Sequence, residues 1–319
     1  MRRFTPDPIR YVFILLCGLL LPFGFVLRHH GVFACPADGY TSNHYLAYCH
    51  VTMYGDYDHS VFWFDLEPDI VSFATDADIL FLGNSRMQFG FSTQATREWF
   101  SSSTDHYFLL GFSSDENMTF AMPVLSKIRP RAKVYIINID RFFEDSETGI
   151  GKEILRDKDA QRRAKEKKFW QALHKPICTT LSMLCGNKTS FFRLRETGEW
   201  QLKGSGSWTA APVVMGSPQD RELWDRYAVL GEQFISRLPV DRSCVLFTIV
   251  PYEGTKLAEA TAIASALKLD LFAPQIDGLR TFDGSHLDRP SAERWSRAFF
   301  QVAGPRIRQC LANEEQTPV

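Results

Sequence analysis

Short apolar runs alternate with helix-forming segments across residues 77–303, and this alternation is the strongest constraint on the fold. Such runs are typical of strands buried on both faces of a parallel sheet. Strand–helix alternation also places helices on both faces, through right-handed crossovers. The sequence therefore predicts an α/β fold with a five-stranded parallel sheet, whose strands are residues 77–82, 106–110, 133–137, 244–250 and 269–272.

The alternation is interrupted at residues 141–217, which we interpret as an insertion in a domain of residues 70–319. Long insertions in compact domains often form lids or substrate-binding loops. Within it, Lys152–Lys168 holds eight basic and four acidic residues. This stretch predicts a solvated helix, or alternatively a patch that faces anionic headgroups or anionic glycan. Residues 31–69 show no clear period and are predicted to be a connecting segment that packs on the domain.

Residues 1–30 predict a cytoplasmic tip followed by a transmembrane helix. Tyr11–Leu27 contains no charged residue, whereas Arg2, Arg3 and Arg10 precede it and Arg28 follows it. Its length is at the short end for a membrane span but exceeds the usual apolar core of a signal peptide. We therefore predict an uncleaved anchor, with a cleaved signal peptide as the alternative. In both cases the basic N-terminus stays in the cytoplasm and the remainder is exported.

The cysteines agree with export. Cys17 lies in the apolar run and leaves six others, an even number that suits an oxidising compartment. Cys35 with Cys49, and Cys178 with Cys185, would each close a short loop, although other pairings are open. The sequence has no Cys/His spacing typical of zinc. Because 36 basic residues nearly balance 37 acidic ones, a nucleic-acid partner is not expected.

Two polar motifs follow predicted strands and should meet at the edge where the carboxyl ends of parallel strands gather. Ser85 follows the first strand in a strand-to-helix turn, and Asp283 and His286 lie between the last strand and the last helix. A serine nucleophile needs a base within hydrogen-bond reach and a carboxylate that orients the base. The motifs therefore predict Ser85 as nucleophile, His286 as base and Asp283 as orienting acid. The structural alternative is a plain turn and a helix-capping loop.

The two motifs resemble those of the SGNH/GDSL hydrolases. That family has its serine in a Gly-Asp-Ser or Gly-Asn-Ser turn and an Asp-x-x-His block near the end, matched here by Gly83-Asn84-Ser85 and Asp283-Gly284-Ser285-His286. The resemblance covers residues 78–303 and implies a flavodoxin-like sheet of order 2-1-3-4-5 without metal or cofactor. A Gly-Asn-Ser-Arg turn behind an anchor is most similar to exported bacterial members that add or remove acyl groups on cell-envelope polymers.

The resemblance also implies donors for an oxyanion hole. The family uses the N–H of the nucleophile, here Ser85, and a glycine after strand two, matched by Gly111. Its asparagine after strand three is not matched, because the register puts Asp140 there, while Asn138 lies two residues earlier. A carboxylate would repel the oxyanion. Thus either Asn138 donates, or Asp140 has another role, or the backbone N–H groups act alone.

Other residues are weaker candidates. Asn84, Arg86 and Asp140 are candidate substrate-binding residues, and Arg86 either binds an anionic group or pairs with a carboxylate. Trp200 and Trp208 either stack on sugar rings or pack in the core.

Alternatives also concern the acid and the family. Asp277 and Asp288 are lesser candidates for the orienting acid. An α/β-hydrolase would need Gly-x-Ser-x-Gly, and Met87 occupies the last position.

Two functions follow from these motifs. The first is an exported O-acyl esterase or O-acyltransferase that acts on an ester of a cell-envelope or surface polysaccharide. It would be anchored in a bacterial inner membrane with its domain in the periplasm, and a membrane-bound acyl donor would be a further partner. The second is a catalytically degenerate envelope protein of the same fold that binds glycan or a partner subunit. The intact serine and Asp-x-x-His motifs favour the first, and the missing asparagine favours the second.

Overall fold

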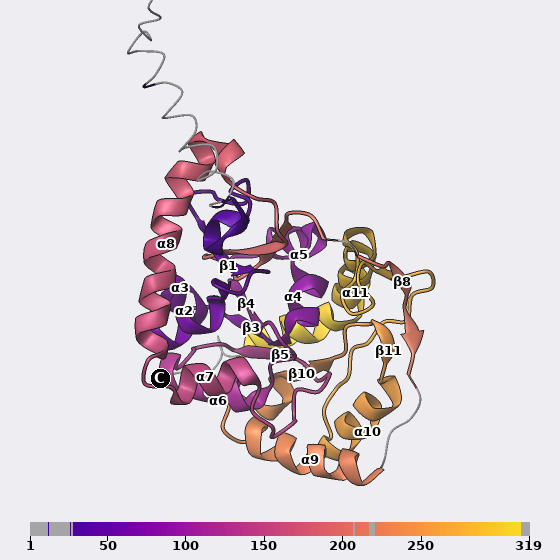
Figure 1. The fold of residues 1–319 in the computed structure, drawn as a ribbon. Helices are drawn as coiled ribbons and strands as arrows, with labels where there is room; N and C mark the ends of the chain where they lie inside the picture. Colours follow the sequence, from indigo (N-terminus) through magenta and orange to yellow (C-terminus); the bar gives the residue numbers. More distant parts are fainter. Residues whose placement is uncertain (1–11, 13–25, 27, 207, 217–220, 314–319) are drawn as a thin grey trace, which may run out of the picture.

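A four-stranded parallel sheet forms the centre of the protein (Figure 1). The computed structural model describes residues 12, 26, 28–206, 208–216 and 221–313. The strand order is β10-β5-β3-β4. These strands match the first four predicted ones and comprise β3 (Ile79–Asn84), β4 (Tyr107–Phe112), β5 (Val134–Asn138) and β10 (Val245–Thr248).

The predicted fifth strand, residues 269–272, is wrong. This segment lies beside β10, but it forms only the isolated bridge Phe247↔Leu271. Phe247 exchanges two backbone hydrogen bonds with Asp270 and Phe272, and the hydroxyl of Thr248 donates to the carbonyl of Phe272. Pro274 follows and has no N–H to extend a ladder.

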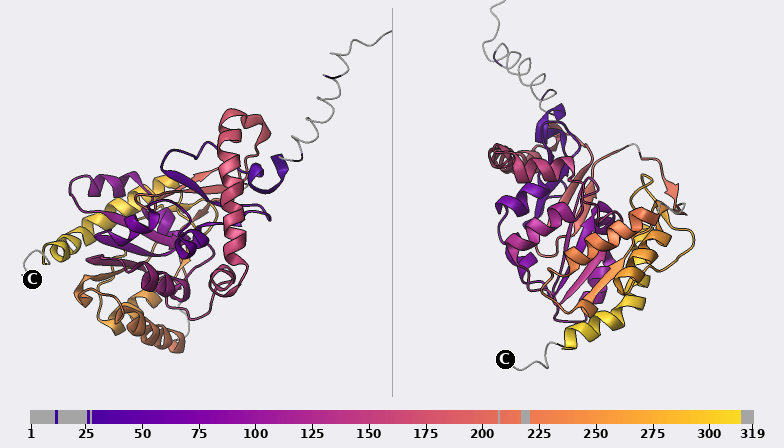
Figure 2. Two further views of the ribbon diagram at one scale, coloured as in Figure 1. Left: turned by 90° about the vertical axis from the view of Figure 1, so that its left-hand side faces the viewer. Right: turned by 90° about the horizontal axis from the view of Figure 1, so that it is seen from below.

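Helices cover both faces of the parallel sheet (Figures 1 and 2). Alternate residues of each strand point to opposite faces, so each face has its own apolar layer. One layer packs on α4, α5 and α11, which are Ser85–Phe91, Gln94–Phe100 and Arg289–Asn313. The other packs on α2 (Asp58–Phe64), α3 (Ile70–Thr75), α6 (Met118–Ile128), α9 (Arg221–Ile235) and α10 (Leu257–Leu267).

A second, antiparallel sheet joins the segment 31–69 to the insertion. Its order is β2-β1-β6-β7, with β1 (His44–Cys49), β2 (Gly55–Asp56), β6 (Ser190–Leu194) and β7 (Trp200–Lys203). The irregular pattern of residues 31–69 gave no indication of β1 or β2. Arg193 of β6 reaches the parallel sheet and donates to the carbonyls of Leu109 and Gly111 on the edge strand β4. The insertion therefore closes one edge of the central sheet.

The charged stretch 152–168 forms parts of two helices rather than one. α7 (Gly149–Arg156) ends before Asp157, and α8 (Ala160–Thr180) begins after Asp159. Asp157 accepts the backbone N–H of Asp159 at 2.8 Å. Such local hydrogen bonds compete with the helix and separate α7 from α8.

The described residues contain three disulfides. Cys35–Cys49 and Cys178–Cys185 confirm the two predicted pairings, and Cys244–Cys310 is the third. The third one ties Cys244, which directly precedes β10, to α11. Gly304-Pro305 is a sequence signal for the end of the last helix, but α11 continues through Pro305. Burial of residues 307, 310 and 311 offsets the hydrogen bond lost at the proline.

The predicted anchor, Tyr11–Leu27, lies almost entirely outside the described residues. Among the residues that the structure does describe, no helix combines the length and apolar character needed to cross a bilayer. The disulfides agree with an oxidising compartment.

Candidate active site

Ser85 begins α4 at the carboxyl end of β3. The turn is tight, because a Cβ atom at Gly83 would lie 2.9 Å from Met87 Cβ and 3.0 Å from Asn138 Cβ. Asn84 stabilises the turn, since its Oδ1 accepts the N–H of Arg86 at 3.0 Å. Ser85 is only 8% exposed, so a substrate must approach its hydroxyl along a defined direction.

Ser85, His286 and Asp283 form a hydrogen-bonded chain. His286 Nε2 lies 2.8 Å from Ser85 Oγ, and His286 Nδ1 lies 2.7 Å from Asp283 Oδ2. A proton on Nδ1, donated to the carboxylate, leaves Nε2 free to accept the serine proton. Burial raises the pKa of Asp283, but the hydrogen bonds and charge of His286 outweigh it and hold that pKa below its ordinary value. The carboxylate is therefore ionised at neutral pH.

The loop that carries the acid and base is held by its own hydrogen bonds. Asp283 Oδ1 accepts the N–H groups of Ser285 and His286 at 3.0 and 2.8 Å. Phe282 N–H donates to the carbonyl of His286 at 3.0 Å, and Gly284 provides the left-handed turn with φ of 83°. These contacts hold the imidazole in place before any substrate binds.

The insertion supports this loop from outside. β8 (Ala211–Pro212) pairs with β12 (Arg280–Thr281), which directly precedes the loop. β9 (Val214–Met215) pairs with β11 (Glu253–Thr255), and Glu253 N–H donates to the carbonyl of Gly284. The insertion, which we expected to form a lid or a substrate-binding loop, therefore stabilises the loop that carries Asp283 and His286.

The two lesser candidates for the acid lie elsewhere. Asp288 Oδ1 accepts the N–H of Ser291 at the start of α11. Asp277 offers its carbonyl oxygen to Arg294. Of the three aspartates considered, Asp283 alone is recorded with its carboxylate against the imidazole of His286.

Arg86 and Asp140 form a buried pair beside the serine. Arg86 Nη1 donates to Asp140 Oδ2 at 2.6 Å and to Asp115 Oδ1 at 2.9 Å. Tyr252 donates its hydroxyl to Asp140 Oδ1 at 3.2 Å and lies under the guanidinium of Arg86. Asn84 Nδ2 is 3.4 Å from Asp140 Oδ2. Arg86 thus pairs with carboxylates, and Asp140 is neutralised where the family pattern would have an asparagine.

Gly111 and Asn138 occupy different surroundings. Gly111 lies in β4, and a Cβ there would be 2.6 Å from Met87 Cε and 2.9 Å from the carbonyl oxygen of Asn84. Glycine is therefore required for the close approach of β4 to the serine turn. Asn138 is fully buried, and its Oδ1 accepts Val250 N–H at 2.9 Å. Its side chain joins β5 to the chain after β10 rather than lining the surface at Ser85.

A row of aromatic rings flanks His286. Phe282 is stacked on His286, with ring planes at 19° and centroids 5.6 Å apart, and Phe89 lies 4.8 Å from the same ring. Phe89 continues to Trp200 at 5.8 Å, and Phe282 continues to Trp208 at 5.3 Å. We call Trp208, Phe282, Phe89 and Trp200 the aromatic row. Trp200 is buried and Trp208 is exposed.

A groove of about 600 Å³ runs along part of this row. Its walls combine aromatic rings with charged side chains from β7, α5 and α11, namely Phe89, Trp200, Phe282, Arg97, Lys203 and Arg289. Pockets for organic ligands typically combine aromatic walls with a few polar groups. The groove is therefore a candidate substrate site next to the imidazole.

Several of these residues were missed by the sequence analysis. Phe282 precedes Asp283, and Phe89 lies one helical turn after Ser85, so both positions could have been found from the two motifs. Tyr252 and Asp115 carry no such signal, because they reach the site from separate loops.

The described residues contain one cluster with the spacing of metal ligands, His174, Cys178 and Cys185. Both cysteines are joined in a disulfide, so the cluster does not suit a metal ion.

No protein-family model matches this chain, and comparisons with curated proteins and with solved structures gave no match.

Proposed function

We propose that the protein is a serine O-acyl esterase or O-acyltransferase of the SGNH type. The observation that carries the proposal is the Ser85–His286–Asp283 chain, with contacts of 2.8 and 2.7 Å. The strand order β4-β3-β5-β10 also supports it, because it equals the first four positions of the order 2-1-3-4-5 that the resemblance implies.

The geometry supports a two-step acyl transfer. Ser85 Oγ attacks the ester carbonyl while His286 Nε2 takes the serine proton. His286 then returns the proton to the leaving alcohol oxygen as the C–O bond breaks, which leaves an acyl group on Ser85. Water or a sugar hydroxyl attacks this acyl-enzyme and gives its proton to His286, which passes it to Ser85 Oγ as the acyl–serine bond breaks. Hydrolysis and transfer therefore differ only in the acceptor.

The developing oxyanion needs donors at the serine. We assign this role to the backbone N–H of Ser85, which has no intrahelical acceptor because it opens α4, and to Gly111 as the second donor. Asp140 can lie close by because Arg86 and Tyr252 compensate its charge. Asn138 remains a weaker candidate, since it is fully buried. Its Oδ1 accepts Val250 N–H, and its Nδ2, the group that would donate to an oxyanion, has no hydrogen-bond partner among the described residues.

The aromatic row favours a carbohydrate ester as substrate. Flat rings with charged groups between them suit the apolar faces and the hydroxyl edges of sugar rings. We therefore propose a cell-envelope or surface polysaccharide as the acyl carrier, with a membrane-bound acyl donor as partner if the reaction is a transfer. The three disulfides support an exported domain, and Tyr11–Leu27 would anchor it in a bacterial inner membrane.

A serine-directed phosphonate tests this proposal directly. The parent protein should be labelled and should release acid from an activated acyl ester, whereas Ser85→Ala should do neither. A parent that fails both tests can still be a strict transferase, so polysaccharide acylation in a Ser85→Ala strain decides that case. Parental acylation in this strain would contradict the enzyme proposal.

The buried amide of Asn138 favours a second candidate, a glycan-binding protein without activity. It predicts no phosphonate labelling of the parent and unchanged glycan affinity in Ser85→Ala.

A further inference from the structure

The helix α8 exposes large apolar side chains. Its buried residues are small or polar, namely Ala160, Ala164, Gln171, His174 and Cys178. Its large apolar residues Phe169, Trp170 and Leu173 are exposed. A surface helix normally buries its apolar stripe. The exposed side of α8 is thus charged and polar up to Lys168 and becomes apolar at Phe169, Trp170 and Leu173.

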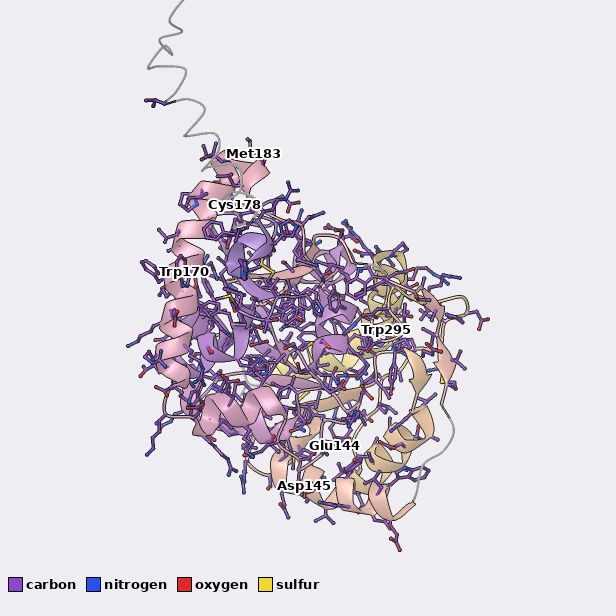
Figure 3. All side chains as sticks on the ribbon, in the orientation of Figure 1. Glu144, Asp145, Trp170, Cys178, Met183 and Trp295 are labelled. Carbon is purple, nitrogen blue, oxygen red and sulfur yellow. A yellow bond between two sulfur atoms is a disulfide. The ribbon has the colours of Figure 1, made fainter. Side chains whose placement is uncertain are left out.

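The exposed apolar surface continues beyond the helix. The disulfide Cys178–Cys185 closes a short loop after α8, and this loop exposes Leu181 and Met183. Figure 3 shows Trp170, Cys178 and Met183 in succession along α8 and its end. We call Phe169, Trp170, Leu173, Leu181 and Met183 the α8 stripe. Contiguous exposed apolar surfaces of this kind mark sites of interaction with proteins or membranes.

The end of the α8 stripe lies where the N-terminal apolar run joins the domain. Arg28, the residue directly after Tyr11–Leu27, donates from Nη1 to the carbonyl of Met183 at 3.5 Å. A Cβ atom at Gly186 would lie 2.8 Å from the carbonyl oxygen of Arg28, so the two segments are in close contact. An anchor in residues 11–27 would therefore hold this end of α8 at the membrane surface.

An apolar pocket of about 390 Å³ lies beside the stripe. Its apolar wall comes from Val32, Phe33, Met53 and Trp170, and Arg163 and Lys167 lie among its polar neighbours. Met53 is 71% exposed, so the pocket opens next to the same surface. Arg163 is paired with Glu153 and Asp157, Lys167 donates to the carbonyl of Asp56, and Glu166 also lines the pocket. The apolar wall therefore suits one acyl chain of a lipid.

We infer that the α8 stripe and this pocket face a lipid bilayer, so that the domain lies against the membrane along α8. The inference rests on the proposed N-terminal anchor, because the anchor supplies the membrane. Tryptophan and other amphipathic aromatic side chains favour the interfacial region of bilayers. Figure 1 shows β8 and β11, which border the catalytic loop, on the side of the molecule opposite α8. The catalytic edge thus remains open to a soluble polymer.

Two tryptophans of equal exposure provide a matched test. Trp170 is 44% exposed on the stripe, and Trp208 is 43% exposed beside the catalytic loop. The full chain, Trp170→Phe and Trp208→Phe are each reconstituted into phosphatidylcholine–phosphatidylglycerol vesicles, with or without bromine on the acyl chains. Bromine quenches tryptophan on contact. Brominated lipid should quench part of the tryptophan emission of the parent. This quenching should disappear in Trp170→Phe and should be as large as in the parent in Trp208→Phe.

The outcomes separate this inference from the anchor. A chain that does not associate with vesicles overturns both the anchor and the inference. A chain that associates but loses the same emission with and without Trp170 overturns the inference alone, and a protein partner or a second copy would then cover the stripe. Leu173→Glu adds a check, since it should reduce the quenching, whereas Val229→Glu on α9 should not.

Discussion

Arg86 Nη1 lies 2.6 Å from Asp140 Oδ2, so the residue that follows the candidate nucleophile is paired with a carboxylate near the end of β5. The pair is nearly buried, with side chains 10% and 1% exposed. Charges in such a place need each other, because removing one leaves the other desolvated and unpaired. The pair is therefore part of the architecture of the serine turn.

Arg86→Met should lower the free energy of unfolding by about 3–5 kcal/mol, since it leaves Asp140 buried without its cation. Replacing both residues by apolar ones of similar volume should cost less than the single change. Urea denaturation measures both effects. A stable Arg86→Met protein that loses only affinity for an anionic substrate would instead identify Arg86 as a substrate-binding residue.

The triad should respond as a unit. His286→Ala should reduce turnover on the order of 10⁶-fold, and Asp283→Asn on the order of 10⁴-fold, because the second change removes only the group that orients the imidazole. Both are measured as kcat on an activated acyl ester. Ser85→Ala removes one hydroxyl and its hydrogen bond to His286, so it should change stability by about 1 kcal/mol. Urea denaturation of this variant would then exclude unfolding as the cause of lost activity. Full activity in His286→Ala would contradict the proposed base.

The aromatic row should matter for large substrates. Trp208→Ala should raise KM for an acylated polysaccharide several-fold and leave kcat/KM for a small activated ester nearly unchanged. A small ester bound at Ser85 does not reach past Phe282 to the exposed Trp208. Phe73→Ala is the control, since Phe73 is a similarly exposed aromatic residue on α3. Equal effects of Trp208→Ala on both substrates would count against a polymer site.

Stability should depend on pH through a buried pair outside the active site. His59 Nδ1 lies 2.9 Å from Asp56 Oδ1 and His59 Nε2 lies 3.0 Å from Glu116 Oε2. Burial lowers the pKa of His59, but Asp56 and Glu116 outweigh it and raise the pKa from 6.5 to about 10. Burial raises the pKa of Asp56, but His59 and Ser113 lower it from 3.8 to about 2.

The two pKa shifts make the protein lose stability at both ends of the pH range. The raised pKa of His59 stabilises the fold fully below 6.5, and this contribution is lost as the pH rises through about 10. The lowered pKa of Asp56 stabilises above 3.8, and its contribution is lost as the pH falls through about 2. Urea unfolding across this range should show both losses. His59→Gln should flatten the alkaline loss, and an unchanged alkaline profile in this variant would contradict the assignment.

Two of the disulfides should differ in their contribution to the free energy of unfolding. Cys244–Cys310 closes a loop of 66 residues and Cys178–Cys185 one of 7. In the chain-entropy account, serine replacement of the first pair should cost about 4 kcal/mol and of the second about 2 kcal/mol. Thermal unfolding of the two double variants measures the order. The reverse order would show that local packing, rather than loop length, sets these contributions.

The sequence predicted the parallel strands because a strand buried on both faces must be apolar throughout, as in Leu80 and Phe81. It also predicted the residues of the Ser85–His286–Asp283 chain from their two motifs. Ser85 follows β3 of the parallel sheet, whereas Asp283 and His286 follow β12, which pairs with β8 rather than with that sheet. The antiparallel sheet was not predictable in this way. β1 pairs with a strand about 150 residues away, as in His44↔Leu194, and neither strand carries a local signal for the other.

Long-range partners also explain the other missed features. The role of Asp140 depends on Tyr252, which lies 112 residues later. Which side of α8 is buried depends on the segments that pack against the helix, and helical periodicity alone does not reveal them. The end of α11 depends on a disulfide across the domain, which outweighs the local signal of Pro305.

Arg193 makes the insertion inseparable from the rest of the fold. Besides capping the edge strand β4, it forms the buried ion pair with Asp58 of α2, at 2.6 Å. A chain shortened between residues 141 and 217 would keep Asp58 in the core without its cation. It would also leave Gln88 as the remaining side-chain donor to the carbonyls of Leu109 and Gly111. Deleting the insertion would therefore destabilise α2 and the edge of the parallel sheet together, rather than remove an independent module.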